Sequence, residues 1–201
     1  VEAERDAALE AGLGVRAADA DELAALPFPA TAAVVLEDQL AIDPARFAHA
    51  LARAFIEAGG RLHAGVAVRG VHVVPSPRLE TDAGPITAGR IVLATGTPIV
   101  DRGLYFAKMS AMRSAAASFR LAGEMPEGMF LSADGPTRSL RPVAAADGPA
   151  GVAQLVVGGA GHPVGRAESE KHLLDELVAW ARDTLPVGDE THRWSAQDYV
   201  S

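Results

Sequence analysis

The fold class follows from residues 154–186, which read QLVVGGAGHPVGRAESEKHLLDELVAWARDTLP. The stretch opens with a short apolar run, Gln154–Val157, that predicts a strand. A glycine-rich segment, Gly158–Gly165, comes next and predicts a turn between strand and helix. Residues 168–185 then place leucines on one helical stripe, with an acidic first turn and Pro186 beyond the end. A strand followed by an amphipathic helix predicts an α/β chain.

A second amphipathic helix begins at Asp43-Pro44. Aspartate is a preferred N-cap, and proline fits the first helical turn without losing a hydrogen bond. Phe47, Leu51 and Phe55 fall on one face of this helix, and we expect that face to be buried. Gly59-Gly60 ends the helix.

Residues 91–94, Ile-Val-Leu-Ala, form an unbroken apolar run that ends in Thr95-Gly96. Strands covered on both faces have this composition, so we predict a central strand with parallel neighbours. Other predicted elements are helices at 1–11 and 19–26, the second opened by a capping box of Asp19 and Glu22. Further strands are predicted at 33–36, 78–82, 114–121 and 138–143, and residues 62–73 predict strands broken by Gly65 and Gly70.

Composition excludes several classes of protein. The chain has 201 residues, 49% of them apolar and 22% charged, which indicates a folded protein with a core. Its net charge of −8 and its scattered Lys and Arg give no support to a nucleic-acid or membrane partner. The absence of cysteine excludes disulfides and thiolate metal sites within these residues. No signal peptide is visible, and we expect a cytoplasmic protein.

Few motifs carry chemistry of their own. The histidines lack metal-ligand spacing, so we expect no metal site, and there is no G-x-S-x-G elbow and no P-loop. Gly159, Gly161 and Gly165 leave one alternative open, the dinucleotide loop of a nicotinamide-dependent reductase. Pro163 would remove a backbone donor from that loop, and Glu168 would repel phosphate, so a simple turn is favoured.

From about residue 36 onward the chain resembles the FAD-dependent oxidoreductases related to D-amino-acid oxidase, glycine oxidase and sarcosine oxidase. Each matching segment is loose alone, and their order and spacing carry the resemblance. The segments are Ile42-Asp43-Pro44, Gly59-Gly60-Arg61-Leu62, Val66-Ala67-Val68, Arg90-Ile91-Val92-Leu93-Ala94-Thr95-Gly96, Ser139-Leu140-Arg141-Pro142, Leu155-Val156-Val157-Gly158-Gly159 and Arg193-Trp194.

The resemblance implies roles for two groups of residues. In this family Val68 would hold the adenine end of FAD by its backbone, and a loop would lie against the dinucleotide, formed here by Ala94, Thr95 and Gly96. The strand around Ser139 would belong to the substrate side of the flavin.

The substrate anchor of the family is not matched. Amino-acid oxidising members often have an aromatic residue at the position of Ser139, and an arginine that binds the substrate carboxylate near Asp198. Aspartate cannot make that bidentate contact. Arg141 is a candidate substitute anchor, with an ordinary surface arginine as the alternative. The resemblance identifies no catalytic acid or base.

The resemblance also implies an interleaved, mixed α+β architecture. Residues 1–36 and 105–188 would form the substrate side, a mixed sheet with helices, and residues 37–104 and 189–201 part of an α/β FAD-binding domain. The glycine-rich motif that binds the pyrophosphate in this family would lie upstream of Val1, and the segment that reaches the flavin ring downstream of Ser201. We therefore expect a fragment of a longer protein that does not retain FAD by itself.

The implied function is that of an FAD-dependent oxidoreductase, which oxidises a small amine or amino-acid-like substrate by hydride transfer to flavin. Two alternatives stay open: a non-catalytic module that binds a ligand or partner, and the nicotinamide-dependent reductase. We expect a small-molecule substrate and self-association through surfaces that missing segments would cover. Apolar patches beside Val68 and Trp194 would mark those surfaces.

Overall fold

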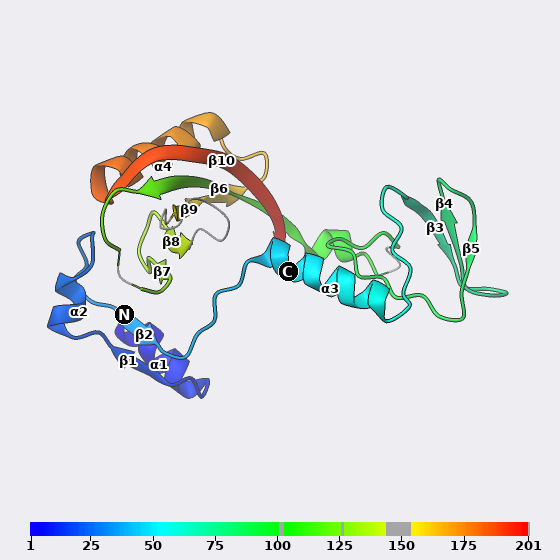
Figure 1. Ribbon diagram of the computed structural model, residues 1–201, viewed down its shortest axis with the longest axis horizontal. Helices are drawn as coiled ribbons and strands as arrows, with labels where there is room; N and C mark the ends of the chain where they lie inside the picture. The colour runs from blue at the N-terminus through cyan, green and yellow to red at the C-terminus, as the bar shows by residue number, and fades with distance from the viewer. Residues whose placement is uncertain (101–102, 126, 144–153, 201) are drawn as a thin grey trace. The chain divides into compact units, whose positions relative to one another are not determined.

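The computed structural model describes residues 1–100, 103–125, 127–143 and 154–200. The chain divides into two compact units (Figure 1). One comprises Val1–Glu37 and Met109–Ser201, and the other comprises Asp38–Lys108.

A five-stranded sheet forms the centre of the first unit, and every neighbouring pair in it is antiparallel. The strand order is β10-β6-β9-β8-β7 (Figure 1). The strands are β6 (Ser110–Leu121), β7 (Phe130–Leu131), β8 (Arg138–Val143), β9 (Gln154–Pro163) and β10 (Val187–Val200). The combination of helices and an antiparallel sheet confirms the mixed α+β class. No strand pair in this sheet is parallel among the described residues.

Helix α4 (Glu170–Thr184) covers one face of this sheet and forms the core with it. Ser169 caps the helix, and its hydroxyl accepts a hydrogen bond from the His172 amide at 3.2 Å. Leu177 is fully buried, as the stripe predicts, whereas Leu173 and Leu174 are half-buried. The largest fully buried side chains of this core are Phe119, Leu155, Val157 and Leu177.

Strand β9 is longer than the sequence predicts. The glycine-rich segment expected to be a turn continues the strand to Pro163, and a turn follows it. Glycine is depleted in strands, so the local sequence argues against this extension. The strand forms because neighbours on both sides pair with it, Ala116 and Ser139 with Gly158, and Ala115 with Gly159.

Four short elements precede the sheet in the first unit: α1 (Glu2–Glu10), β1 (Val15–Ala17), α2 (Ala20–Ala24) and β2 (Val34–Leu36). The predicted capping box opens α2. The Glu22 amide donates to the Asp19 carboxylate at 2.8 Å, and the Asp19 amide donates to the Glu22 carboxylate at 2.9 Å. Phe28 then packs edge-on against Phe130 of β7, with the ring centroids 5.8 Å apart.

The second unit combines one long helix with a three-stranded antiparallel sheet of order β3-β4-β5. Its elements are α3 (Pro44–Glu57), β3 (Val68–His72), β4 (Arg78–Thr81), β5 (Ile86–Thr87) and the 3-10 helix η1 (Tyr105–Lys108). Asp43 caps α3 as predicted, since its carboxylate accepts from the amides of Ala45 and Arg46, both at 3.0 Å.

The prediction of a central strand at residues 91–94 is wrong for this structure. The segment has no strand pairing, and Val92 is 86% exposed. A parallel strand needs hydrogen-bonding neighbours, and every strand pair among the described residues of this unit is antiparallel. An apolar run predicts burial, but it does not supply the neighbours.

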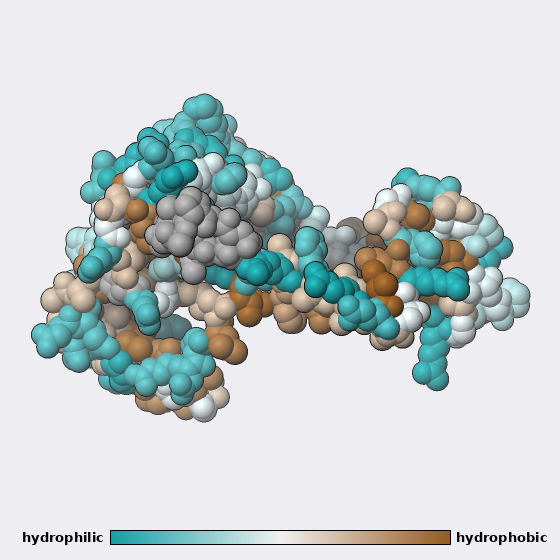
Figure 2. Space-filling view, viewed as in Figure 1, coloured by the Kyte–Doolittle hydropathy of each residue, from teal (hydrophilic) through white to brown (hydrophobic). Residues whose placement is uncertain are grey.

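The predicted burial of the α3 face is also wrong here. Phe47, Leu51 and Phe55 are 52%, 55% and 51% exposed. Apolar residues show on the surface of this unit along the helix and beside its sheet (Figure 2). Periodicity identifies the apolar face of a helix, but the residues that cover the face must come from elsewhere.

The two units bear on the expected domain limits in different ways. The boundaries of the second unit, at 38 and 108, lie close to the expected limits of 37 and 104. Residues 189–200, however, belong to β10 and pair with β6 in the first unit, not with residues 37–104. The assignment of the units to a substrate side and an FAD side stays a prediction.

Candidate functional site

The predicted site residues fall in different units. Ser139 and Arg141 lie on β8 of the first unit, while Val68 and the segment Ala94–Gly96 lie in the second.

Ser139 and Arg141 share the face of the five-stranded sheet that α4 does not cover, here called the α4-distal face. Leu140, between them, is 3% exposed and belongs to the core under α4. Successive strand residues point to opposite faces, so its two neighbours point away from the helix. Ser139 is exposed and Arg141 half-buried.

Register shows which residues accompany them on the α4-distal face. Ser139 pairs with Gly158, which pairs with Ala116, which pairs with Trp194. The row through Arg141 continues to Val156, Ser118 and His192. Neighbouring strands are ~4.8 Å apart, so each row crosses about 14 Å of sheet.

Small residues occupy the middle of the first row. A Cβ atom built on Gly158 would lie 2.4 Å from the Ser139 hydroxyl oxygen, so glycine leaves the space that this hydroxyl takes. Trp194, at the end of the row, is 42% exposed. The row thus offers a hydroxyl at one end and an aromatic surface at the other, with no large side chain between.

A charged network on the opposite face holds β10 against α4. Arg193 donates a hydrogen bond of 2.6 Å from Nη2 to the Glu190 carboxylate. It donates another, of 2.8 Å, from Nη1 to the carboxylate of Asp175 on α4. Hydrogen bonding from Arg193 lowers the pKa of Glu190, and bonds from Lys171 and Arg193 lower the pKa of Asp175. Because Arg193 is tied to the helix side, the next residue, Trp194, projects from the α4-distal face.

In the second unit the predicted FAD residues are exposed. Val68 begins β3 opposite Thr81 and is 38% exposed. The Thr95 hydroxyl donates to the Thr97 carbonyl at 2.6 Å, and no atom would lie within 4 Å of a Cβ on Gly96. The backbone of this loop is therefore open to a ligand.

An apolar hollow of about 270 Å³ lies next to these residues in the second unit. It is lined by Val71, His72, Val73, Pro77, Ile91, Leu93 and Val100. Ile91 and Leu93 thus contribute to a surface shared with β3, although they form no strand.

The described residues do not fit the diphosphate of FAD. A pyrophosphate is bound by free amides at a helix N-terminus and is stabilised by the helix dipole. Each of the four α-helices in the described parts of the chain has a carboxylate in its cap or first turn: Glu2 in α1, Asp19 in α2, Asp43 in α3 and Glu170 in α4. Phosphate would be repelled at each of these ends.

The glycine loop of the nicotinamide alternative is not formed. Gly159 and Gly161 lie within β9, where Gly159 is paired between Ala115 and Arg138. Only Gly165 follows the strand, with a φ of 76° in the turn. A strand–loop–helix cradle for a dinucleotide is therefore missing at this position.

Among the described residues, no group of three or more His, Asp or Glu side chains is placed to hold a metal ion. No helix in this part of the chain is both long and apolar enough to cross a membrane.

Sequence reasoning missed the partners of Ser139 and Arg141 on the α4-distal face. Ala116, Ser118 and Val156 lie in segments predicted to be strands, but strand register decides that they share rows with Ser139 and Arg141. In the sequence, only the motif Arg193-Trp194 pointed to Trp194, which ends the row that begins at Ser139.

Comparisons with known proteins agree with this architecture. The model of the DAO family, which is described as FAD dependent oxidoreductase, matches residues 1–198. The putative Rieske 2Fe-2S iron-sulfur protein YhfW of Bacillus subtilis (strain 168) is 26% identical over 178 residues, which are 88% of this chain and 34% of that protein. The chain contains no cysteine, so these residues provide no thiolate for such a cluster.

A solved structure shares the fold. Glycine oxidase from Geobacillus kaustophilus matches 96% of this chain and 53% of its own chain, with a TM-score of 0.72 and 17% sequence identity. The chain therefore spans about a third of YhfW and about half of the glycine oxidase chain.

Proposed function

Because this chain belongs to the family of FAD dependent oxidoreductases, we propose that it works as part of an enzyme that oxidises a small amine or amino-acid-like substrate. FAD, if bound by the complete protein, would supply the redox chemistry of such an oxidation. The chain's own contribution is to bind and orient that substrate on the α4-distal face.

The arrangement of Ser139 and Arg141 carries this proposal. Both side chains project from one sheet face, and Gly158 leaves space beside the Ser139 hydroxyl. An arginine guanidinium binds a carboxylate in a bidentate manner, and a hydroxyl can donate or accept a further hydrogen bond. We assign Arg141 to an anionic group of the substrate and Ser139 to a neighbouring polar group.

Val68 and the segment Ala94–Gly96 are proposed to contact the adenosine part of FAD. Their exposure supports this role, since Val68 is 38% exposed and Ala94, Thr95 and Gly96 are all exposed. The diphosphate must be held by other residues, because the helix N-termini described above carry carboxylates. We propose that this chain alone does not retain FAD, which a net charge of −8 also disfavours.

The test uses the complete reading frame that contains this chain, purified with its flavin. Anaerobic mixing with a panel of amines and amino acids should bleach the flavin absorbance with at least one of them. Arg141→Gln should raise the KM for substrates that carry a carboxylate by at least about tenfold and leave uncharged amines unaffected, since a charge-assisted bond is worth about 1.5–3 kcal/mol.

The matched control is Arg166→Gln, because Arg166 is an exposed arginine of the same unit that lies in the turn after β9, away from β8. A protein without flavin absorbance would support the non-catalytic binding module instead. An unchanged KM in Arg141→Gln would remove Arg141 from the substrate site and leave the oxidoreductase function in place.

A further inference from the structure

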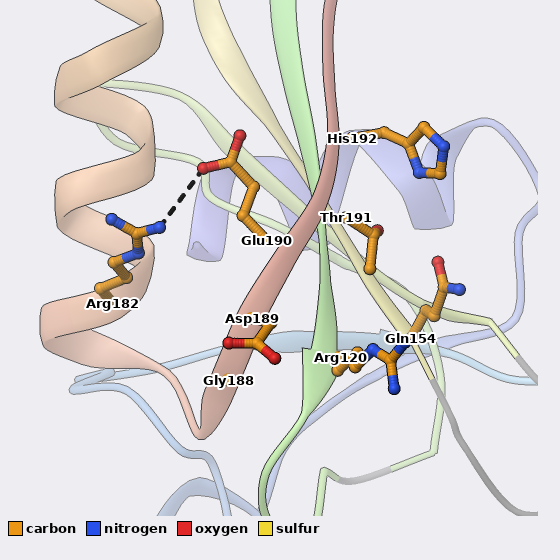
Figure 3. A pocket seen from close by; sticks show the side chains of 8 residues that line it. All are labelled: Arg120, Gln154, Arg182, Gly188, Asp189, Glu190, Thr191 and His192. Atoms are coloured by element: carbon orange, nitrogen blue, oxygen red, sulfur yellow. Dashed lines mark hydrogen bonds and ion pairs between the residues drawn. The ribbon is translucent and has the colours of Figure 1, made fainter.

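A polar cavity of about 1040 Å³ lies at the start of β10 (Figure 3), and neither Ser139 nor Arg141 lines it. The pairing of β10 with β6 is regular from His192 to Val200, but the register shifts twice between Val187 and His192. Bulges of this kind redirect side chains and are frequent beside binding sites. The redirected residues line the cavity, among them Asp189, Glu190 and His192.

Two of the charged residues in the cavity wall already have partners. Arg182 of α4 forms an ion pair with the Glu190 carboxylate at 3.4 Å. The dashed line in Figure 3 marks this pair. Glu190 also accepts from Arg193, which lowers its pKa and keeps it ionised. These groups satisfy one another and form a fixed side of the cavity.

Arg120 and Asp189 are different. Among the described residues neither side chain makes an ion pair or a side-chain hydrogen bond, with each other or with any neighbour. Arg120 pairs with Gln154 in the register of β6 and β9, so the guanidinium and the amide lie side by side. The cavity therefore presents one unpaired cation and one unpaired anion, both exposed, with the Gln154 amide beside the cation (Figure 3).

We propose that this cavity binds a small zwitterion, with its carboxylate on Arg120 and Gln154 and its ammonium group on Asp189. The charged lining residues are Arg120, Arg182, Asp189 and Glu190, whose charges sum to zero. A multiply charged anion such as phosphate would be repelled by the two carboxylates, and a simple cation by the two guanidinium groups. A ligand with separated opposite charges satisfies both unpaired residues. The proposal does not depend on flavin or on turnover.

Binding of γ-aminobutyrate to the full chain, measured by NMR chemical-shift changes, tests this proposal. Butyrate and butylamine, which each carry one of the two charges, are the matched probes. The zwitterion should bind at least about tenfold more tightly than either. Arg120→Gln should abolish its advantage over butylamine, and Asp189→Asn its advantage over butyrate.

Two control variants remove the same charges outside the cavity. Arg166→Gln and Asp183→Asn change exposed residues and should leave the affinity unchanged. Far-ultraviolet circular dichroism checks that every variant is folded. Equal affinities for the three probes, or no saturable shift with γ-aminobutyrate, would overturn the proposal. Glycine and β-alanine then measure which separation of charges the cavity prefers.

Discussion

Alanine substitutions at the neighbouring glycines Gly158 and Gly159 should differ in their effect on stability. A Cβ on Gly159 would lie 2.9 Å from the Thr137 carbonyl oxygen and 3.1 Å from a Leu177 methyl group. The first of these atoms belongs to the backbone and cannot rotate away. A Cβ on Gly158 would lie 2.4 Å from the Ser139 hydroxyl, but its next neighbours are 3.8 and 3.9 Å away.

The magnitudes follow from these contacts. Overpacking a core position costs about 1–3 kcal/mol, and replacing a strand glycine by alanine regains about 0.5–1 kcal/mol. Gly159→Ala should therefore lower the free energy of unfolding by about 0.5–2 kcal/mol. Gly158→Ala should change it by less than about 1 kcal/mol, because the serine hydroxyl can turn to another rotamer. Adding Ser139→Ala to Gly158→Ala should relieve the remaining crowding.

Urea unfolding followed by tryptophan fluorescence measures these differences. Both tryptophans of the chain, Trp180 and Trp194, lie in the unit that contains β9, so the signal reports that unit. The Ser139→Ala variant alone serves as the reference for the double variant. A larger loss in Gly158→Ala than in Gly159→Ala would refute the assigned strand position of these glycines.

Three further predictions concern burial, pH and self-association. Leu177→Ala should lower the free energy of unfolding by about 3–5 kcal/mol, and Leu51→Ala by less than about 1 kcal/mol, because Leu177 is 0% exposed and Leu51 is 55% exposed. Similar losses for the two variants in chemical denaturation would contradict this prediction. Arg16 lowers the pKa of Glu22 to about 2, so the stabilisation from this pair should be present above about pH 4.5 and lost as the pH falls toward 2. NMR titration of the Glu22 carboxyl should show this, and a pKa at its ordinary value would exclude the ion pair. Phe47→Ser with Leu51→Ser should reduce self-association in sedimentation velocity, and an unchanged distribution would show that the α3 face is not the contact.

Local interactions made several elements predictable. Asp19 and Glu22 form the capping box, and Asp43 caps α3, because each contact joins residues three positions apart or fewer. Helix α4 likewise follows from its own stripe and ends. The order of the loose motifs identified the family correctly, although no single motif is specific.

Burial and strand extent depended on residues far away in the chain. The glycines of β9 form a strand because β6 and β8 pair with them, although glycine itself disfavours strands. The apolar run at 91–94 stays outside any strand because no neighbour pairs with it among the described residues. The apolar face of α3 is visible in its sequence, yet its exposure is a property of what packs on it.

The candidate site shows the same division. The sequence alone identified Ser139 and Arg141 as residues of one strand, and their spacing of two places them on one face. Only the tertiary structure decided that Leu140 faces α4, so that Ser139 and Arg141 share the opposite face with Trp194. Strand spacing is a local property of the chain, whereas register and coverage are set by contacts between segments far apart in the chain, such as the pairing of Trp194 with Ala116, 78 positions away.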